Sequence, residues 1–441
     1  MFNAIVSWPI APVTKSLVLN ALRGLECTVV PLPAGHRNLF WSTYDDIDHE
    51  LVHSNRDTML SSSYTFRKAL IRKHFLSRCL QSYITKHPDS KLKTAAPKTF
   101  EIELSFVDEL DEMFLDELWE LGKELEGGRK WWILKPGMAD RGNGIRIFNS
   151  KMALEKIFDD FEEADSDVED ESGGEEDKTA VVTSQLRHFV IQEYLSNPLL
   201  IDPAQVSIDD SSKPEEPQGF KFHLRAYCVA SCALQLFLFD KILALFSAVP
   251  YIKPSVGKDE DGDPLPLDLS PHLTNTSLQT DRGEEGVRLL EELVSCQVLS
   301  GPQDAPKTQF TSEDMKTIVD QMVIVLGETF KAALENPIHF QPLPNAFELF
   351  GIDFLVTDSP SSSASQRFEV KLLEINAEPA IELTGPRLSW ILQDLFTAIG
   401  KVCVDPFFSP TDAPEWPVGA SRHGLIKCLD EEVRGPAAAQ S

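Results

Sequence analysis

The most constraining feature of the sequence is a pair of apolar runs between Phe347 and Thr384. FELFGIDFLV and FEVKLLEINA each have the length of a strand, and a cluster of turn formers, TDSPSSSASQ, separates them. This pattern predicts two neighbouring strands joined by a flexible loop. Asp353 interrupts the first run. Glu374 and Asn376 interrupt the second run, and their spacing of two places them on one face of a strand.

Oxygen-bearing side chains brought together in this way suit a hard cation such as Mg²⁺, with nucleotide phosphates completing its shell. The alternative is a pair of ordinary half-buried strands whose polar residues face water. Acidic interruptions of apolar strands would then be costly unless they were solvated. The strand pattern alone leaves both interpretations open.

Composition narrows the classes of partner. A net charge of −28 over 441 residues argues against a nucleic-acid-binding surface, which needs a basic footprint. The longest strongly apolar uncharged run, from Ala226 to Phe239, is shorter than the roughly 20 residues of a spanning helix. The N-terminus lacks the basic region of a secretory signal, and the 7 cysteines include no CxxC pair. We therefore expect a cytoplasmic protein with neither nucleic acid nor membrane as a partner.

Several segments have clear local patterns. The opening segments FNAIVSW, TKSLVLNALRGL and CTVVPLP predict a β-α-β start, typical of a small α/β domain. The run 159–177, DDFEEADSDVEDESGGEED, predicts a disordered acidic insertion because like charges repel and little apolar surface is available for burial. Apolar spacing predicts helices over Thr58–Ile84, Val107–Leu125, Glu284–Val298, Glu313–Leu334 and Arg387–Val402.

Two basic segments are candidates for phosphate binding. In WWILKPGMADRGNGIRIFN, an apolar strand delivers Lys135 to a turn that contains Arg141, Gly142 and Gly144. Glycines let backbone N–H groups approach phosphate oxygens, although many hairpins also carry glycines at the turn. In KFHLR, three cationic or potentially cationic residues alternate and so share one strand face, which could bind phosphates or simply face solvent. These residues are Lys221, His223 and Arg225.

The order of six segments carries a family resemblance. WILKP…RGNGI, VIQEYLSNPLLI, KFHLRAY, HLTNTS, FELFGIDFLV and LLEINAEPA occur between roughly Phe66 and Val402. This succession resembles the tubulin–tyrosine ligase family, a branch of the ATP-grasp superfamily. FRKAL, at Phe66 to Leu70, looks like the family's N-terminal basic motif. The motif patterns of a protein kinase, HRD and DFG, are absent from the sequence.

The resemblance implies an α+β chain with an ATP-grasp fold, in which two lobes clasp ATP. The implied parts are a small N-terminal α/β domain over 1–57, a central lobe over 58–206, a C-terminal lobe with a Mg²⁺ site over 219–404 and a mobile tail over 405–441. It assigns Mg²⁺ to Asp353, Glu374 and Asn376, and catalysis to Arg225 and Glu374. The implied ATP-binding residues are Lys68, Lys135, Arg141, Gly142, Gly144, Gln192, Glu193, Tyr194, Leu195, Lys221, His223 and Asn275.

The implied activity is ATP- and Mg²⁺-dependent ligation. The γ-phosphoryl of ATP would activate a protein carboxylate as an acylphosphate, and a free amino acid would displace phosphate. The tubulin C-terminal tail is a candidate acceptor. A ligase with a non-tubulin acceptor and a non-catalytic ATP-grasp interaction module are the alternatives. Because acidic oxygens would repel one another in the empty site, Glu374→Gln is expected to fold as well as the parent or slightly better.

The sequence departs from the family pattern at three places. His223 stands where the tyrosine ligases usually have Asp, and Leu245 stands where an arginine that contacts the amino-acid substrate is common. The motif usually written EVNGAPA reads EINAEPA here. The nucleotide and metal residues therefore match the family, whereas the residues that recognise the amino acid do not.

Overall fold

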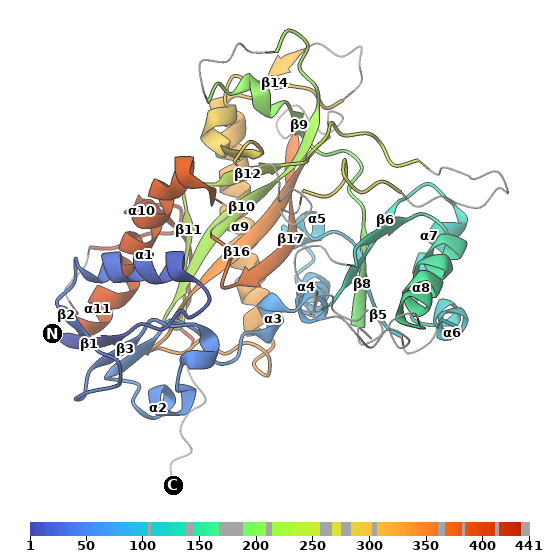
Figure 1. Cartoon of the computed structure of the whole chain (residues 1–441). Helices are drawn as coiled ribbons and strands as arrows, with labels where there is room; N and C mark the ends of the chain where they lie inside the picture. Colours follow the sequence, from blue (N-terminus) through green and yellow to red (C-terminus); the bar gives the residue numbers. More distant parts are fainter. Residues whose placement is uncertain are drawn as a thin grey trace.

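The computed structural model describes residues 1–104, 107–137, 144–166, 188–208, 214–255, 267–274, 284–301, 307–359, 367–381, 384–410 and 414–433. Three larger sheets and one two-stranded sheet organise this part of the chain (Figure 1). The N-terminal sheet is parallel, in the order β2-β1-β3-β4, and confirms the predicted β-α-β start. Its elements are β1 (Phe2–Ile5), α1 (Pro12–Leu22), β2 (Cys27–Val29), β3 (Asn38–Phe40), α2 (His49–Ser54) and β4 (Met59–Ser61).

The second sheet is antiparallel, in the order β5-β8-β6-β7. Its strands are β5 (Thr99–Glu103), β6 (Trp132–Pro136), β7 (Arg146–Phe148) and β8 (His188–Glu193). Leu134 and Ile191 belong to a core shared with α6 (Glu109–Leu115), α7 (Trp119–Glu126) and α8 (Lys151–Ser166). Because side chains alternate along a strand, Ile133 and Lys135 of β6 lie on the opposite face, away from these helices.

Helix α8 corrects the prediction of a disordered insertion over 159–177. The helix continues to Ser166, and residues 167–177 lie outside the described part of the chain. Leu154, Ile157, Phe158 and Phe161 follow the helical spacing, and all four are buried in the same core. The charged residues between them concealed this apolar stripe in the sequence.

The third and largest sheet is centred on β10 (Phe220–Ser231), which pairs with β11 (Gln235–Phe239), β12 (Leu243–Phe246), β16 (Phe347–Asp358) and β9 (Leu200–Ile201). β12 pairs with β13 (Val287–Leu289), and β16 pairs with β17 (Phe368–Ala377). The two predicted strands near the C-terminus are therefore β16 and β17, and they are antiparallel neighbours.

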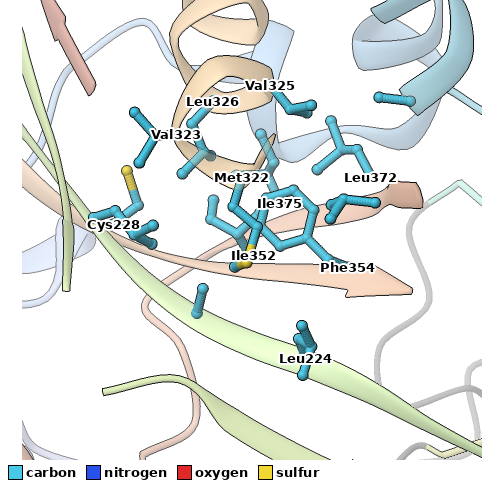
Figure 2. Packing of buried hydrophobic residues seen from close by; sticks show 14 of the residues in the cluster. Leu224, Cys228, Met322, Val323, Val325, Leu326, Ile352, Phe354, Leu372 and Ile375 are labelled. Carbon is cyan, nitrogen blue, oxygen red and sulfur yellow. The ribbon is translucent and has the colours of Figure 1, made fainter. Parts of the chain in front are cut away.

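Helix α9 (Ser312–Leu334) covers one face of this sheet, as Figure 1 shows. In Figure 2, Leu224 and Cys228 of β10 lie on the same side of the sheet as Met322 and Leu326 of α9. Tyr227 and Val229 of β10 belong to a second core with α1 and α10 (Ser389–Ile399). The alternation of β10 therefore places Lys221, His223 and Arg225 on the face away from α9.

Two more of the predicted helices differ from the structure. Val107–Leu125 forms two helices, α6 and α7, separated at Asp116. Glu284–Val298 contains β13, a 3₁₀ turn at Leu290–Leu293 and β14 (Gln297–Val298), because β13 pairs with β12 instead of continuing a helix. The short strand β15 (Thr308–Gln309) pairs with β14. The short helix α5 (Leu92–Ala95) precedes β5.

The predicted mobile tail over 405–441 is also wrong for much of its length. Chain segments α11 (Asp405–Phe408), β18 (Ser421–Arg422) and β19 (Leu425–Asp430) are ordered elements, and β19 adds to the sheet beside β11. Leu425 and Leu429 are buried, so apolar side chains hold this strand. Residues 434–441 lie outside the described part. None of the described helices is long and apolar enough to cross a membrane.

Candidate functional site

A pocket of about 680 Å³ lies between the β5–β8 sheet and the sheet centred on β10. β6, β8 and the segment after β8 supply one wall, and β10, β16 and β17 supply another. The lining residues are Ile133, Lys135, Ile145, Gln192, Glu193, Tyr194, Leu195, Lys221, His223, His272, Leu273, Thr274, Asp353, Leu355, Leu373 and Glu374.

Arg225 and Asp353 form a two-point ion pair at this pocket. They are direct cross-strand neighbours on β10 and β16. Arg225 Nε donates to Asp353 Oδ1 at 2.5 Å, and Nη2 donates to Oδ2 at 3.0 Å. Burial opposes the charged guanidinium, but the Asp353 carboxylate outweighs burial and raises the pKa of Arg225. The arginine therefore remains charged beside the carboxylate.

Glu374 lies opposite Asp353 in the register of β16 and β17, and Asn376 lies two residues further along β17. Asn376 Nδ2 donates to Glu374 Oε1 at 3.2 Å, and Lys73 Nζ lies 3.5 Å from Glu374 Oε2. Burial acts to raise the pKa of Glu374, but the charges of Lys73 and Lys135 outweigh burial and hold the pKa well below its ordinary value. The structure therefore brings together the three residues that the strand pattern singled out.

These contacts overturn the expectation that acidic oxygens repel one another at the empty site. Asp353 is neutralised by Arg225, and Glu374 lies close to Lys73. Removal of the Glu374 charge should therefore destabilise the fold instead of relieving repulsion. The sequence did not reveal this because Lys73 is distant in the chain from the strand that carries Glu374.

The donor set fits Mg²⁺ only if a ligand supplies further oxygens. Among the described residues, no group of three or more His, Cys, Asp or Glu side chains could hold a metal ion. Two carboxylates and the amide oxygen of Asn376 remain. Mg²⁺ commonly binds through one or two carboxylates together with substrate phosphates, so this set is sufficient when phosphates are present.

Lys135 and Lys221 are buried cations, with only 8% and 7% of their surfaces exposed. Lys135 Nζ donates to Gln192 Oε1 at 2.8 Å, and Lys221 Nζ donates to the Tyr194 hydroxyl at 3.3 Å. Within the described ranges, neither amine has a carboxylate oxygen within ion-pairing distance. Burial lowers the pKa of Lys135 to about 8 and that of Lys221 to about 7. Two buried amines with no carboxylate at ion-pairing distance favour an anionic ligand.

Two histidines, His223 and His272, also line the pocket. His223 Nδ1 lies 2.6 Å from Thr274 Oγ1, and His272 Nδ1 lies 2.9 Å from the Tyr194 hydroxyl. Burial lowers the pKa of both rings, to about 4 for His272. Both rings are therefore neutral near pH 7. The Nε2 atoms of His223 and His272 are buried and make no hydrogen bond to any described residue, and that of His223 lies 3.6 Å from Asp353 Oδ1.

The structure places the other candidates as follows. Gln192, Glu193, Tyr194 and Leu195 line the pocket along the end of β8 and the segment after it. Gly144 has a φ of +71°, and a Cβ there would lie 2.8 Å from Pro136 Cγ, so this position requires glycine. Arg141, Gly142 and Asn275 lie outside the described residues.

Lys73, and not Lys68, is the N-terminal lysine at the site. Lys68 begins α3 (Lys68–Ile71) and is exposed, whereas Lys73 begins α4 (Lys73–Lys86) and approaches Glu374. His272 and Thr274 also line the pocket, although no sequence pattern indicated them. They flank Leu273 in the segment HLTNTS, so the segment was found but the contribution of these residues was not.

The departures from the family pattern have structural explanations. Leu245 pairs with His223 across β10 and β12, is buried and belongs to the apolar core with α1 and α10. Glu378 is exposed just beyond β17, where Thr43 Oγ1 and the Tyr44 backbone N–H donate to its carboxylate at 2.9 and 2.8 Å. Glu378 therefore connects the end of β17 to the segment that follows β3 of the N-terminal sheet.

Comparison with known proteins identifies the family. The model of the tubulin–tyrosine ligase family matches residues 53–412. The chain belongs to this family. It is 39% identical over 382 residues to the probable tubulin–tyrosine ligase PBY1 of Saccharomyces cerevisiae, covering 84% of this chain and 46% of that protein. A probable tubulin–tyrosine ligase of Schizosaccharomyces pombe is 37% identical over 409 residues, covering 89% of each chain.

A solved structure supports the same fold. The crystal structure of the C-terminal domain of K. lactis Pby1, described as an ATP-grasp enzyme interacting with the mRNA decapping enzyme Dcp2, matches with a TM-score of 0.65 and 31% identity. The match covers 98% of this chain and 100% of that one. The α+β ATP-grasp architecture predicted from the sequence is confirmed. The chain spans about half the length of the budding-yeast relative.

Proposed function

We propose that this protein is an ATP- and Mg²⁺-dependent carboxylate–amine ligase that joins a free amino acid to a protein carboxylate. One observation carries the proposal: two buried lysines, neither of them ion-paired with a described carboxylate, share a pocket with two carboxylates on neighbouring strands. Buried amines of this kind suit phosphates, and carboxylates beside them suit the metal that accompanies phosphates. Family membership and the ATP-grasp fold support the same activity.

The nucleotide would occupy the pocket with its phosphates between the two sheets. Lys135 and Lys221 would neutralise phosphate charge, and the Nε2 atoms of His223 and His272 would provide polar contacts. Gln192 to Leu195, which line the pocket, would border the base. Asp353, Glu374 and Asn376 would hold Mg²⁺.

The chemistry has two steps. A carboxylate oxygen of the acceptor bonds to the γ-phosphorus of ATP, the bond from that phosphorus to the β–γ bridging oxygen breaks, and ADP leaves. The nitrogen of the amino acid then bonds to the acyl carbon, the acyl–oxygen bond breaks, and inorganic phosphate leaves as the nitrogen loses a proton. Mg²⁺ supplies charge neutralisation at the phosphates when it is bound.

The residues of this chain contribute charge and position. Arg225 is held in place by its two hydrogen bonds to Asp353, so its guanidinium needs little reorganisation to stabilise charge on the transferring phosphoryl. Burial of Lys135 and Lys221 excludes water from the same region. No nucleophilic side chain is required, because the acceptor carboxylate itself attacks.

The acceptor is proposed to be a protein, with the tubulin C-terminal tail as the first candidate and a cytoplasmic location. Related proteins in this family include a human tubulin polyglutamylase, 21% identical over 65% of this chain, and a Tetrahymena thermophila tubulin glycylase, 23% identical over 64%. A non-tubulin acceptor is the alternative, and the decapping enzyme named as a partner of the K. lactis domain is one protein to test.

The test combines the protein with MgATP, a panel of labelled amino acids, and either tubulin or a mixture of cell proteins. Release of ADP and transfer of label to one acceptor, both abolished by Asp353→Asn, would support the ligase. A protein that binds the nucleotide but releases no ADP with any combination would instead support the second candidate, an interaction module. Leu245 favours that candidate. Its side chain packs in the apolar core, and it stands at the position where the family commonly has an arginine that binds the substrate.

A further inference from the structure

A second pocket, of about 590 Å³, adjoins the first. The two pockets share Lys135, Gln192, Leu373 and Glu374, so the hydrogen bond between Lys135 and Gln192 belongs to their common wall. The second pocket extends from this wall toward α3, α4 and α5. Its remaining lining residues are Leu70, Ile71, Lys73, Leu76, Ser77, Leu80, Gln81, Ala96, Pro97, Thr99, Val190, Leu372, Ile375 and Asn376.

One face of α4 forms a long side of this pocket. Lys73, Leu76, Ser77, Leu80 and Gln81 are spaced by three and four residues, which places them on one face of the helix. Gln81 lies eight residues after Lys73, a distance of about 12 Å along the helix. The pocket therefore extends for about two turns of α4 away from the carboxylates.

The character of the lining changes along this length. At the common wall, Lys73 lies 3.5 Å from Glu374, with Lys135 on the other side. Further along α4 the walls are aliphatic, from Leu76 and Leu80. Among the described lining residues the cations are Lys73 and Lys135, and both belong to the end near Glu374. A ligand that fits has charged groups at one end and an apolar group at the other.

We infer that this second pocket binds the substrate amino acid and that α4 selects an apolar side chain. The inference rests on the proposed ligase function, because it places the amine beside the site of phosphoryl transfer. An acidic side chain would lie against Leu76 and Leu80 without a matching cation, which is costly. Glycine would leave the apolar walls without contacts. The specificity therefore differs from that named for the polyglutamylase and glycylase relatives.

The α4 side of the pocket suits a single amino acid better than a length of acceptor peptide. An extended peptide needs backbone hydrogen-bond partners along its path. The side of the pocket formed by α4 offers side chains only, since the backbone groups of the helix bond to one another. Beyond Lys73 its polar groups are Ser77 and Gln81.

Binding measurements test the inference without turnover. The protein is loaded with MgCl₂ and a non-hydrolysable ATP analogue, and leucine, phenylalanine, glutamate and glycine are titrated separately by calorimetry. Leucine or phenylalanine should bind at least tenfold more tightly than glutamate and glycine, the scale expected for burial of an apolar side chain. Equal or tighter binding of glutamate or glycine would overturn the inference.

Two variants of α4 test the location. Gln81 is exposed at the far end, so Gln81→Lys should fold normally and supply the missing cation. It should tighten glutamate binding at least fivefold and leave leucine binding within twofold. Ser77→Leu should weaken phenylalanine binding at least tenfold by filling the apolar end, whereas Ser77→Ala should not. Unchanged glutamate affinity in Gln81→Lys, with unchanged phenylalanine affinity in a folded Ser77→Leu, would contradict the assignment.

The same titrations distinguish a failure of the proposed ligase function from a failure of the amino-acid assignment of the second pocket. If the parent protein binds the nucleotide analogue but none of the four amino acids, the assignment of the second pocket fails and the nucleotide site stands. If the parent does not bind the nucleotide analogue, the proposed function fails, and the inference that rests on it fails too.

Discussion

Replacement of Glu374 by glutamine tests the electrostatic account of the site. Glu374 accepts a hydrogen bond from Asn376 and lies 3.5 Å from the Lys73 amine. Its side chain is 23% exposed and that of Lys73 is 21% exposed, so the pair is intermediate between surface and buried pairs. Exposed pairs contribute up to about 1 kcal/mol, and breaking a buried pair costs about 3–5 kcal/mol. We expect Glu374→Gln to lower the free energy of unfolding by about 1–2 kcal/mol.

The pH dependence of this loss has a definite sign. The folded-state pKa of Glu374 lies below its ordinary value of 4.5, so its charge stabilises the fold above that pH. The difference in stability between parent and variant should therefore be complete at pH 7. It should shrink as the pH falls below about 4.5, because the unfolded parent then takes up a proton on this carboxylate while the folded parent still carries the charge, and it should vanish once the pH falls below the folded-state pKa. Chemical denaturation at a series of pH values measures the difference.

Glu369→Gln is the matched control. Glu369 is on the same strand, and its carboxylate lies 2.8 Å from the Lys371 amine, but it lines neither pocket. Both variants lose one ion pair of a glutamate on β17. Only Glu374→Gln should reduce ATP turnover, by about 100-fold or more, the scale of losing one electrostatic contact to a transition state. A Glu374→Gln protein that is more stable than its parent, or equally active, would refute the reasoning.

Three further predictions follow from the geometry. Phosphate binding should protonate Lys221 and Lys135, whose pKa values are about 7 and about 8. The affinity for an ATP analogue should therefore fall at least tenfold between pH 7.0 and 8.5. Calorimetry in different buffers should show proton uptake on binding. Lys73→Met should reduce turnover at least tenfold and Lys68→Met should leave it within twofold, as steady-state assays can compare. Phe161→Ala should cost about 3 kcal/mol in chemical denaturation, because the ring is buried in the α8 core.

The sequence predicted those helices and strands whose apolar residues recur at a single regular spacing. Helix α9 is apolar at helical spacing and begins with a Thr311 capping box, so both its face and its start follow from neighbouring residues. The pairing of β16 with β17 follows equally from two apolar runs and a turn cluster. The alternation of Lys221, His223 and Arg225 on β10 placed three site residues on the correct face.

Other features depend on residues distant in the chain. The predicted helix over Thr58–Ile84 is divided into β4, α3 and α4, and Arg72 between the two helices has extended backbone angles. This break allows Lys73 to approach Glu374, a contact that no spacing within the segment encodes. In the same way, β19 is a strand because β11 offers an edge to it, although its own sequence is short and lies in a Pro-rich region.

Neighbouring acidic residues were the most misleading signal. The acidic oxygens of the site suggested repulsion at the carboxylates, and the acidic run suggested disorder over 159–177. Within the site, however, the carboxylates of Asp353 and Glu374 each have a nearby cation, and the first part of the acidic segment continues a helix through Phe161. A total charge cannot show which charges lie together, because the fold determines their distances.

The most direct test of the central claim is Mg²⁺-dependent nucleotide binding at the buried lysines. Calorimetry with a non-hydrolysable ATP analogue should give a dissociation constant at millimolar Mg²⁺ that weakens at least tenfold in EDTA. The same loss is expected in Lys221→Met at saturating Mg²⁺, with the fold confirmed by its melting temperature. Absence of binding by the parent at millimolar Mg²⁺, or parental affinity in a folded Lys221→Met, would contradict the account.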